Sequence, residues 1–344
     1  MSSSSLDPLI VDSYDYKLPQ NLIATTPSNP KDSAKLLIYD RKKDKITHAI
    51  FKDILDFIPN ECAIFLNDTK VIKARIFGEK PSGGKIELLL NSPLQDNRFL
   101  VYIKGRVKEG LELLFDENLK AKIERLNSDG TRVVKFFKDQ KELSFEELNS
   151  VLEKIGHIPL PPYINREDNK DDESDYQSLF AKQLGAVAAP TASLHFTKEL
   201  LKKMQESFDS YYVTLHVGAG TFKPVTAKSI KDHKMHEEIF HIPPSSKDVI
   251  LSDKAILAVG TTVTRTIEYF ARTKKESGKS DLFLHPQNRP LRVDHLLTNF
   301  HLPKSTLLML VASFVGIEKT LKLYEEAIKK DYRFYSYGDA MLIL

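Results

Sequence analysis

The chain has 344 residues, of which 41% are hydrophobic and 28% are charged, as is ordinary for a globular protein. This composition excludes a wholly disordered chain, a fibre and a membrane bundle, and at about 150 residues per domain the length predicts roughly two domains. Fifty Lys and Arg against 47 Asp and Glu leave a net charge of +3, too small to indicate nucleic-acid binding without a local basic patch.

Three further features of the sequence favour a soluble protein of the cytoplasm. Cys62 is the single cysteine, so neither an internal disulfide nor a CxxC metal site is possible, which fits a reducing compartment. Residues 1–8 lack a basic stretch followed by an apolar one, so no secretory signal is predicted. The longest apolar run, residues 307–315, falls short of the roughly 20 residues that span a bilayer, and a buried helix is expected there.

The first half of the chain is predicted to be rich in strands. Apolar runs at residues 35–39 and 63–66 predict two of them. Between residues 74 and 134, strand-sized segments alternate with turn residues at a spacing of roughly 8 to 12, the pattern of a small antiparallel β-barrel. These segments are residues 75–77, 85–90, 99–103, 111–115, 121–126 and 131–134.

The barrel is expected to end at a helix over residues 144–155, which Ser144 can cap together with Glu147. Residues 159–163 contain three prolines and are expected to form a rigid return segment, because proline fixes φ and lacks a donor. The acidic residues 168–175 are expected to form a solvated loop.

Helices and apolar strands alternate in the second half, which indicates an α/β body. The helices are expected at residues 197–207 and 264–273, and the strands at 211–215 and 256–259. The strands before Asn67 resemble those of the second half. We therefore predict a discontinuous α/β body domain, residues 1–73 and 156–344, with an inserted small antiparallel β-barrel domain, residues 74–155.

Polar clusters follow three of the predicted body strands, which is the usual position of ligand sites in α/β sheets. Asp68 and Lys70 follow the first strand, although a turn or a cap would explain them as well. His216 to Phe222 follows another, and its glycines 218 and 220 would let backbone N–H groups approach a polar ligand. A tight turn is an equal alternative for this glycine pair.

The third cluster, Gly260 to Thr266, combines a glycine, several hydroxyls and Arg265 in the first turn of a predicted helix. The helix dipole disfavours a cation at that end, so we expect an anion near Arg265. The alternative is an ordinary helix cap that uses Thr264 and Glu268.

Histidines are frequent in the second body segment. His233 and His236 could share a helix face as metal ligands or proton carriers. Zinc is nevertheless the weaker interpretation, because no further cysteine and no HExxH spacing accompany them, and we expect no metal. The histidines of this segment include His195, His216, His233, His236, His241 and His301.

Nine motifs stand in order along nearly the whole chain, at residues 65–72, 159–164, 186–192, 194–197, 215–222, 233–236, 258–262, 298–307 and 335–341. Together they resemble the S-adenosylmethionine:tRNA ribosyltransferase-isomerases of queuosine biosynthesis. The chain departs from the family pattern at Val263, where a serine is usual, at Ser193, where a glycine is usual, and around Gln287, where a Pro-Gly turn is usual. These departures concern the contacts of single positions.

The resemblance implies an α/β body with an inserted barrel, and an unusual use of S-adenosylmethionine. Such enzymes transfer and isomerise its ribosyl moiety onto the aminomethyl group of 7-aminomethyl-7-deazaguanine at the tRNA wobble position. The products are epoxyqueuosine-tRNA, adenine and methionine. S-adenosylmethionine is thus a consumed co-substrate and no cofactor is implied; the implied partner is tRNA, with no membrane, and we expect a monomer.

The chemistry implied by the resemblance needs proton transfers. The sulfonium acidifies the adjacent 5′ C–H, so a base must remove that proton, adenine must leave and the amine must attack carbon. Groups that titrate near neutrality suit these steps, which favours histidine. The catalytic candidates are His216 first, then His195 and His301, with Asp68 near the sulfonium or as a second carboxylate.

The remaining candidates are binding residues. For the S-adenosylmethionine pocket they are Gly218, Gly220, Thr221, Gly260, Thr261, Thr262 and Arg265. For tRNA phosphates they are Lys70, Lys73, Arg75, Lys104, Arg106 and Lys108, with an ordinary solvated face as the alternative for the last three.

Two other functions compete with this one. A metal-dependent hydrolase would use the histidines as ligands. A non-catalytic RNA-binding protein would use the barrel alone, but would leave the polar clusters at the strand ends of the body without a purpose.

Overall fold

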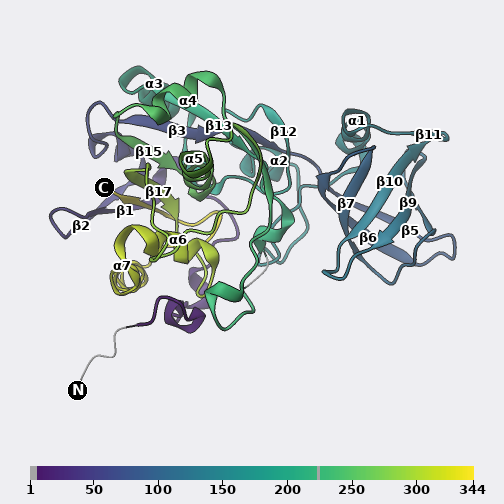
Figure 1. The fold of residues 1–344 in the computed structure, drawn as a ribbon, viewed down its shortest axis with the longest axis horizontal. Coiled ribbons are helices and arrows are strands. Elements are labelled where there is room, and N and C mark those ends of the chain that lie inside the picture. Colours follow the sequence, from purple (N-terminus) through teal and green to yellow (C-terminus); the bar gives the residue numbers. More distant parts are fainter. Residues whose placement is uncertain (1–5, 223–224) are drawn as a thin grey trace.

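The computed structural model describes residues 6–222 and 225–344 and shows a larger body beside a smaller barrel (Figure 1). The body is built on a nine-stranded sheet with the order β16-β14-β13-β3-β15-β17-β18-β1-β2. Strands β13, β3, β15 and β17 run parallel at its centre. Antiparallel pairings add β14 and β16 on one side and β18 on the other, and β1 then pairs parallel with β18 and antiparallel with β2. The strands are β1 (Lys35–Asp40), β2 (Lys45–Ile50), β3 (Ala63–Asn67), β13 (Ser210–Leu215), β14 (Glu238–His241), β15 (Ile256–Val259), β16 (Ser277–Ser280), β17 (His295–Asn299) and β18 (Ala340–Ile343).

Both faces of this sheet are covered, because successive side chains of a strand point to opposite faces. Leu36 packs with α3 and a 3-10 helix on one face, whereas Leu37 packs with α6 and α7 on the other. Helices α4 and α5 cover the latter face over β3, β13 and β15. The helices are α3 (Lys198–Ser207), α4 (Pro244–Leu251), α5 (Thr261–Thr273), α6 (Thr306–Val315) and α7 (Ile317–Lys329), with 3-10 turns at η1 (Val11–Tyr14), η2 (Gln20–Leu22), η3 (Lys31–Ser33), η4 (Phe51–Asp56), η5 (Thr191–His195), η6 (Ala219–Phe222) and η7 (Ile230–Asp232).

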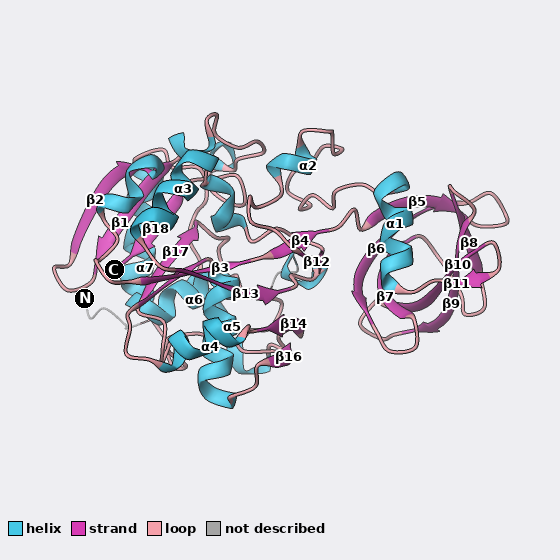
Figure 2. Cartoon of the chain, turned by 90° about the horizontal axis from the view of Figure 1, so that it is seen from above, coloured by secondary structure: helices cyan, strands magenta, loops and turns pink. Residues whose placement is uncertain are grey.

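The barrel is a closed antiparallel sheet that lies beside the body (Figure 2). Its six strands follow the order β5-β6-β7-β10-β9-β8, and the pairing of β8 with β5 closes the ring; β11 is a short addition to β10. Apolar side chains such as Leu88 and Phe99 fill the interior. The strands are β5 (Arg75–Glu79), β6 (Lys85–Pro93), β7 (Arg98–Lys104), β8 (Glu112–Phe115), β9 (Leu119–Leu126), β10 (Arg132–Lys138) and β11 (Lys141–Glu142). The predicted fold class, an α/β body with an inserted antiparallel barrel, is confirmed.

Helix α1 (Phe145–Ile155) packs on the barrel through Leu148 and Leu152. Its predicted capping box is present, because the Glu147 N–H donates to Ser144 Oγ at 3.3 Å and the Ser144 N–H donates to Glu147 Oε2 at 3.0 Å. The elements β5 to α1 thus occupy residues 75–155, while the proposed domain boundaries remain a prediction.

Two short parallel strands, β4 (Thr69–Val71) and β12 (Gln183–Ala186), form a ribbon next to the start and the return of the barrel segment. The acidic stretch near the return differs from the expected solvated loop, since helix α2 (Asp172–Asp175) forms there and Asp172 is buried. The Asp172 carboxylate accepts two hydrogen bonds from Arg166, at 2.6 and 2.7 Å. A bidentate guanidinium allows this charge to be buried, so the prediction was wrong for Asp172.

Candidate active site

The polar clusters predicted after the body strands meet at one edge of the sheet. Carboxyl ends of parallel strands lie side by side, and the register places Val213 beside Asn67 and Val259 beside Leu297. Strand β18 runs antiparallel to β17, with Ala340 opposite Asn299, so the chain that precedes β18 reaches the same edge. We refer to this region as the carboxyl edge.

Asn67, the last residue of β3, joins three elements there and is fully buried. Its Oδ1 accepts the N–H groups of Thr69 and Leu215, each at 3.1 Å. Its Nδ2 donates to the Leu215 carbonyl at 3.0 Å and to Thr262 Oγ1 at 3.1 Å. Asn67 was not among the predicted site residues, although a polar residue that ends an apolar strand is a usable signal.

His216 lies directly after β13 and contacts the ribbon of β4 and β12. Its Nδ1 is 2.8 Å from the hydroxyl oxygen of Thr69. Gly185 lies against the ring, with a φ of 147° and space for no side chain, because a Cβ there would stand 2.9 Å from Nδ1. Burial lowers the pKa of His216, so the ring is neutral at pH 7.

Asp68 follows Asn67 and is 7% exposed. The Thr214 hydroxyl donates to Asp68 Oδ1 at 2.6 Å. Burial nevertheless raises the pKa of the Asp68 carboxyl, because it disfavours the charged form more than this hydrogen bond supports it. A carboxyl with a raised pKa is suited to exchange protons.

His195, at the end of η5, reaches the carboxyl edge through Asn299. Asn299 Nδ2 is 3.3 Å from His195 Nε2 and also donates to the carbonyl of Tyr335 at 3.0 Å. Because a carbonyl fixes that amide nitrogen as a donor, His195 Nε2 is the acceptor. Burial lowers the pKa of His195 to about 3, with a smaller effect of Arg333.

His301 follows β17 and is held on several sides. Its ring Nε2 is 2.8 Å from Thr298 Oγ1, and its backbone N–H donates to the Tyr324 hydroxyl at 3.1 Å. The Tyr16 hydroxyl donates to its carbonyl. Burial lowers the pKa of His301 to about 3, so it is neutral at pH 7.

The glycine loop after β13 is bound to the barrel and to β14. The Gly218 N–H donates to Glu238 Oε1 at 3.2 Å, and the Ala219 N–H donates to Asn91 Oδ1 of β6 at 2.9 Å. Gly220 admits the His236 ring, which a Cβ would approach to 2.6 Å. Thr221 belongs to η6, but its side chain lies outside the described residues.

Arg265, near the start of α5, has an anion beside it, because its Nη1 forms a buried ion pair with Glu238 of β14. Its Nε donates to the Leu282 carbonyl at 3.1 Å, while Nη2 is buried without a partner among the described residues. The helix begins at Thr261 with Gly260 as its N-cap, earlier than predicted. Glu268 does not cap it; its carboxylate accepts the N–H groups of residues 291–293.

Two of the three departures from the family pattern are buried. Val263 packs in the apolar cluster under α5. Ser193 is buried in η5, and its hydroxyl has no hydrogen-bond partner within residues 6–222 and 225–344. Gln287 lies in the turn between His285 and Asn288 and donates its N–H to His285 Nδ1 at 3.4 Å.

The basic candidates fall into two groups. Lys73 pairs with Glu173 at 2.9 Å, and Arg75 pairs with Glu87 at 2.8 Å. Lys70 is half-buried within β4 of the ribbon. The second group comprises Lys104, the last residue of β7, and Arg106 and Lys108 in the loop that follows. All three are exposed, and none forms an ion pair with a described residue.

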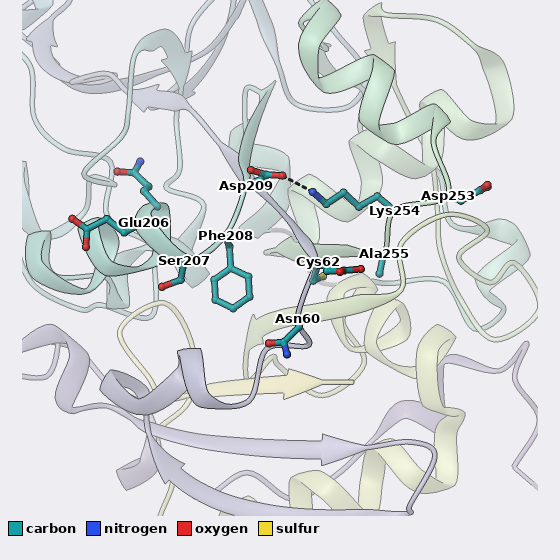
Figure 3. Close-up of a pocket in the computed structure, with 11 residues that line it drawn as sticks. Asn60, Cys62, Glu206, Ser207, Phe208, Asp209, Asp253, Lys254 and Ala255 are labelled. Atoms are coloured by element: carbon teal, nitrogen blue, oxygen red, sulfur yellow. Dashed lines mark hydrogen bonds and ion pairs between the residues drawn. The ribbon is translucent and has the colours of Figure 1, made fainter.

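The opposite edge of the sheet carries an open pocket of about 660 Å³, drawn in Figure 3. Asp209 and Lys254 form an ion pair across it. Cys62 lies at this pocket, and burial raises the pKa of its thiol to about 11, so it is not a reactive thiolate. None of the predicted site residues lines it; the lining is Asn60, Glu61, Cys62, Gln205, Glu206, Ser207, Phe208, Asp209, Asp253, Lys254 and Ala255.

His233 and His236 do not share a helix face, because η7 ends at Asp232. Within residues 6–222 and 225–344, no group of three or more His, Cys, Asp and Glu side chains is arranged to hold a metal ion. Over the same residues, the helices are all too short or too polar to cross a membrane.

The fold and the carboxyl edge define a class of protein: an α/β body that gathers polar side chains at the ends of its parallel strands, with a barrel inserted beside them. The chain belongs to the queuosine biosynthesis protein family, whose model matches residues 11–343. It is 64% identical over 339 residues to a protein of Aliarcobacter butzleri and 60% identical over 345 residues to one of Sulfurimonas denitrificans, each named S-adenosylmethionine:tRNA ribosyltransferase-isomerase.

These matches span both regions of the molecule. The first covers 98% of this chain and 100% of the relative, and the second covers 100% of both. A crystal structure named S-adenosylmethionine tRNA ribosyltransferase, from Thermotoga maritima, is 34% identical with a TM-score of 0.54, over 96% of this chain and 100% of that chain.

Proposed function

We propose that the chain transfers and isomerises the ribosyl moiety of S-adenosylmethionine onto the aminomethyl group of 7-aminomethyl-7-deazaguanine in tRNA. The products are epoxyqueuosine-tRNA, adenine and methionine. The observation that carries this proposal is 64% identity over the full length of a relative named for this activity. The carboxyl edge supports this proposal, because Asp68, His195, His216 and His301 all lie at this one edge of the sheet.

In this proposal the carboxyl edge binds S-adenosylmethionine and performs the chemistry. Asp68 has a buried carboxyl whose pKa is raised, so it can accept and release a proton. His195 and His301 are neutral at pH 7 and serve as hydrogen-bonding groups that shape the site. Arg265, at the start of α5, stays a proposed binding residue, because its buried Nη2 has no hydrogen-bond partner among the described residues.

The exposed cations of the barrel bind tRNA phosphates in the same proposal. Lys104, Arg106 and Lys108 have no ion-pair partner in the described part of the chain, so their charge is available to a polyanion. We further propose that the protein acts in the cytoplasm, where tRNA is modified, and as a monomer. Light scattering on the purified protein measures the second point.

The activity is tested by incubating the purified protein with S-adenosylmethionine and tRNA that carries the aminomethyl-deazaguanine base. Mass spectrometry then quantifies free adenine, free methionine and the modified nucleosides. We expect adenine and methionine in equal amounts together with an epoxycyclopentane-bearing nucleoside. S-adenosylhomocysteine with a methylated nucleoside would show methyl transfer instead.

The two alternative functions, a metal-dependent hydrolase and a non-catalytic RNA-binding protein, are not favoured. The family model matches residues 11–343 and so includes the whole carboxyl edge, which an RNA-binding barrel alone would not use. A metal-dependent hydrolase would lose its activity in a chelator, whereas we expect ribosyl transfer to persist. The adenine-release assay with tRNA that lacks the aminomethyl-deazaguanine base is the control for both alternative functions.

A further inference from the structure

The contact between Thr69 and His216 determines which nitrogen of the histidine bears hydrogen. Thr69 is fully buried in β4, and its Oγ1 lies 2.8 Å from His216 Nδ1. Gly185 of the paired strand β12 closes the other side of the ring. The imidazole is therefore fixed in one orientation against the ribbon.

A count of hydrogens assigns the direction of this bond. A threonine hydroxyl has one hydrogen to donate, and a neutral imidazole has one nitrogen that donates and one that accepts. Within the described part of the chain, His216 Nδ1 is the one hydrogen-bond partner of Thr69 Oγ1. If Nδ1 carried the hydrogen, the hydroxyl hydrogen would be buried without an acceptor, which costs its full desolvation penalty. The hydroxyl therefore donates to Nδ1, and Nε2 carries the hydrogen of the ring.

His216 is only partly buried, and its Nε2 has no hydrogen-bond partner among the described residues. We propose that Thr69 is a positioning residue that holds His216 in the Nε2–H tautomer, so that His216 donates a hydrogen bond to the substrate and does not accept the proton. This deepens the proposed function and rests on it for the identity of the substrate.

The chemistry of the proposed reaction offers an acceptor for this donor. Adenine leaves with the electron pair of the C–N bond that breaks, so negative charge develops on its nitrogens. A neutral N–H aimed at developing charge stabilises the transition state without transferring a proton. The proton of the 5′ carbon must then go to a different group of the edge, and Asp68 is the candidate that carries a carboxylate.

Nitrogen NMR tests the tautomer without any need for activity. The full-length protein is labelled with 15N-histidine, and the signals of His216 are assigned by their loss in His216→Gln. We expect Nε2 to be protonated in the wild type and in Thr69→Ser, which keeps the hydroxyl. In Thr69→Val, which has nearly the same shape without the hydroxyl, we expect a mixture of both tautomers. An Nδ1–H tautomer in the wild type, or an unchanged tautomer in Thr69→Val, would overturn the proposal.

Steady-state kinetics then distinguish a positioning role of Thr69 from a purely structural one. We expect Thr69→Val to lower kcat by about tenfold or more with KM for S-adenosylmethionine within about twofold of the wild type, and Thr69→Ser to restore kcat. Thr47→Val in β2, at the far side of the sheet, is the matched control and should leave kcat unchanged. An unchanged kcat in Thr69→Val would overturn this inference but not the proposed function. A wild type that releases no adenine would contradict the proposed function, and the NMR result would still decide the tautomer.

Discussion

The barrel and the carboxyl edge of the body bury different kinds of side chain. In the described barrel segment, residues 75–155, the buried polar side chains are Thr131 and Asn149. The carboxyl edge alone buries Asn67, Asp68, Thr69, His195, Asn299 and His301. The barrel thus gains its stability from a nearly apolar interior, whereas the edge holds polar groups at the cost of their desolvation, compensated by hydrogen bonds.

The ion pairs of the two regions differ in the same way. Arg265 and Glu238 pair with side-chain exposures of 7% and 4%, whereas Arg98 and Glu124 of the barrel pair with exposures of 42% and 32%. Removing one partner of a buried pair leaves an uncompensated charge, but removing one partner of an exposed pair leaves a solvated one. We therefore expect the loss of one partner to destabilise the protein at the edge and to have little effect at the barrel surface. Under the proposed function, chemistry depends on the edge and tRNA affinity depends on the barrel surface.

The largest effect is expected at Asp68. Asp68→Asn should lower kcat by at least about 100-fold, because it removes a proton-accepting group while Thr214 can still donate to the amide oxygen.

The same variant, Asp68→Asn, should be more stable than the wild type at neutral pH. Burial raises the pKa of the folded carboxyl, so its contribution to stability is present below the unfolded pKa and is lost as the pH rises through the folded pKa.

Urea unfolding at pH 7.5 and near pH 4 checks the sign of this effect. The stability difference between Asp68→Asn and the wild type should be largest at the higher pH and should shrink at the lower one. A difference that grows on acidification would show that the folded pKa of Asp68 is lowered.

A second, smaller effect is expected for the buried ion pair. Arg265→Met should lower the free energy of unfolding by about 3 to 5 kcal/mol, because Glu238 remains buried without its guanidinium. Arg98→Met in the barrel is the matched control and should leave stability nearly unchanged. Urea unfolding measures both, and equal losses at the two sites would remove the contrast between the regions.

The barrel surface should affect tRNA binding and leave the chemistry intact. The triple variant Lys104→Gln, Arg106→Gln, Lys108→Gln should weaken tRNA affinity by about tenfold and reduce the salt slope of log K by about 2 to 3, with kcat unchanged. The control removes the same charge from α3 of the body, at Lys198, Lys202 and Lys203. Filter binding at several salt concentrations measures the slopes, and equal slopes for both triple variants would assign the effect to net charge alone.

The smallest effect is expected for helix N-caps, which stabilise helices in both regions. Ser144→Ala in α1 and Thr197→Ala in α3 each remove a side chain that accepts a backbone N–H at a helix start. Each should lower the free energy of unfolding by about 1 kcal/mol without changing kcat. If one variant also lost activity, its helix start would have a role beyond local stability.

The sequence allowed accurate prediction where the cause is local. The capping box of Ser144 and Glu147 and the barrel strands depend on residues a few positions apart. Strands β14 and β16 escaped prediction because they are short, and β16 (Ser277–Ser280) contains no apolar run. Their place is set by pairing with each other and with β13.

The site could be predicted less fully than the fold, because its contacts are distant in the chain. The strand-end pattern indicated Asp68 and His216, but Thr69 and His216 are 147 positions apart and no local signal joins them. The anion expected beside Arg265 exists, yet it belongs to Glu238, 27 positions away. The acidic stretch around Asp172 similarly depended on Arg166 folding back onto it.

The hydrogen bond from the Ala219 N–H to Asn91 Oδ1 connects the barrel to the loop that follows His216. Any rotation of the barrel about the β4–β12 ribbon must therefore break this bond or carry the loop with it. Under the proposed function, this link couples tRNA binding at the barrel to ligand binding at the carboxyl edge. Such a coupling is reciprocal: if the ligand changes the affinity for tRNA by some factor, tRNA changes the affinity for the ligand by the same factor.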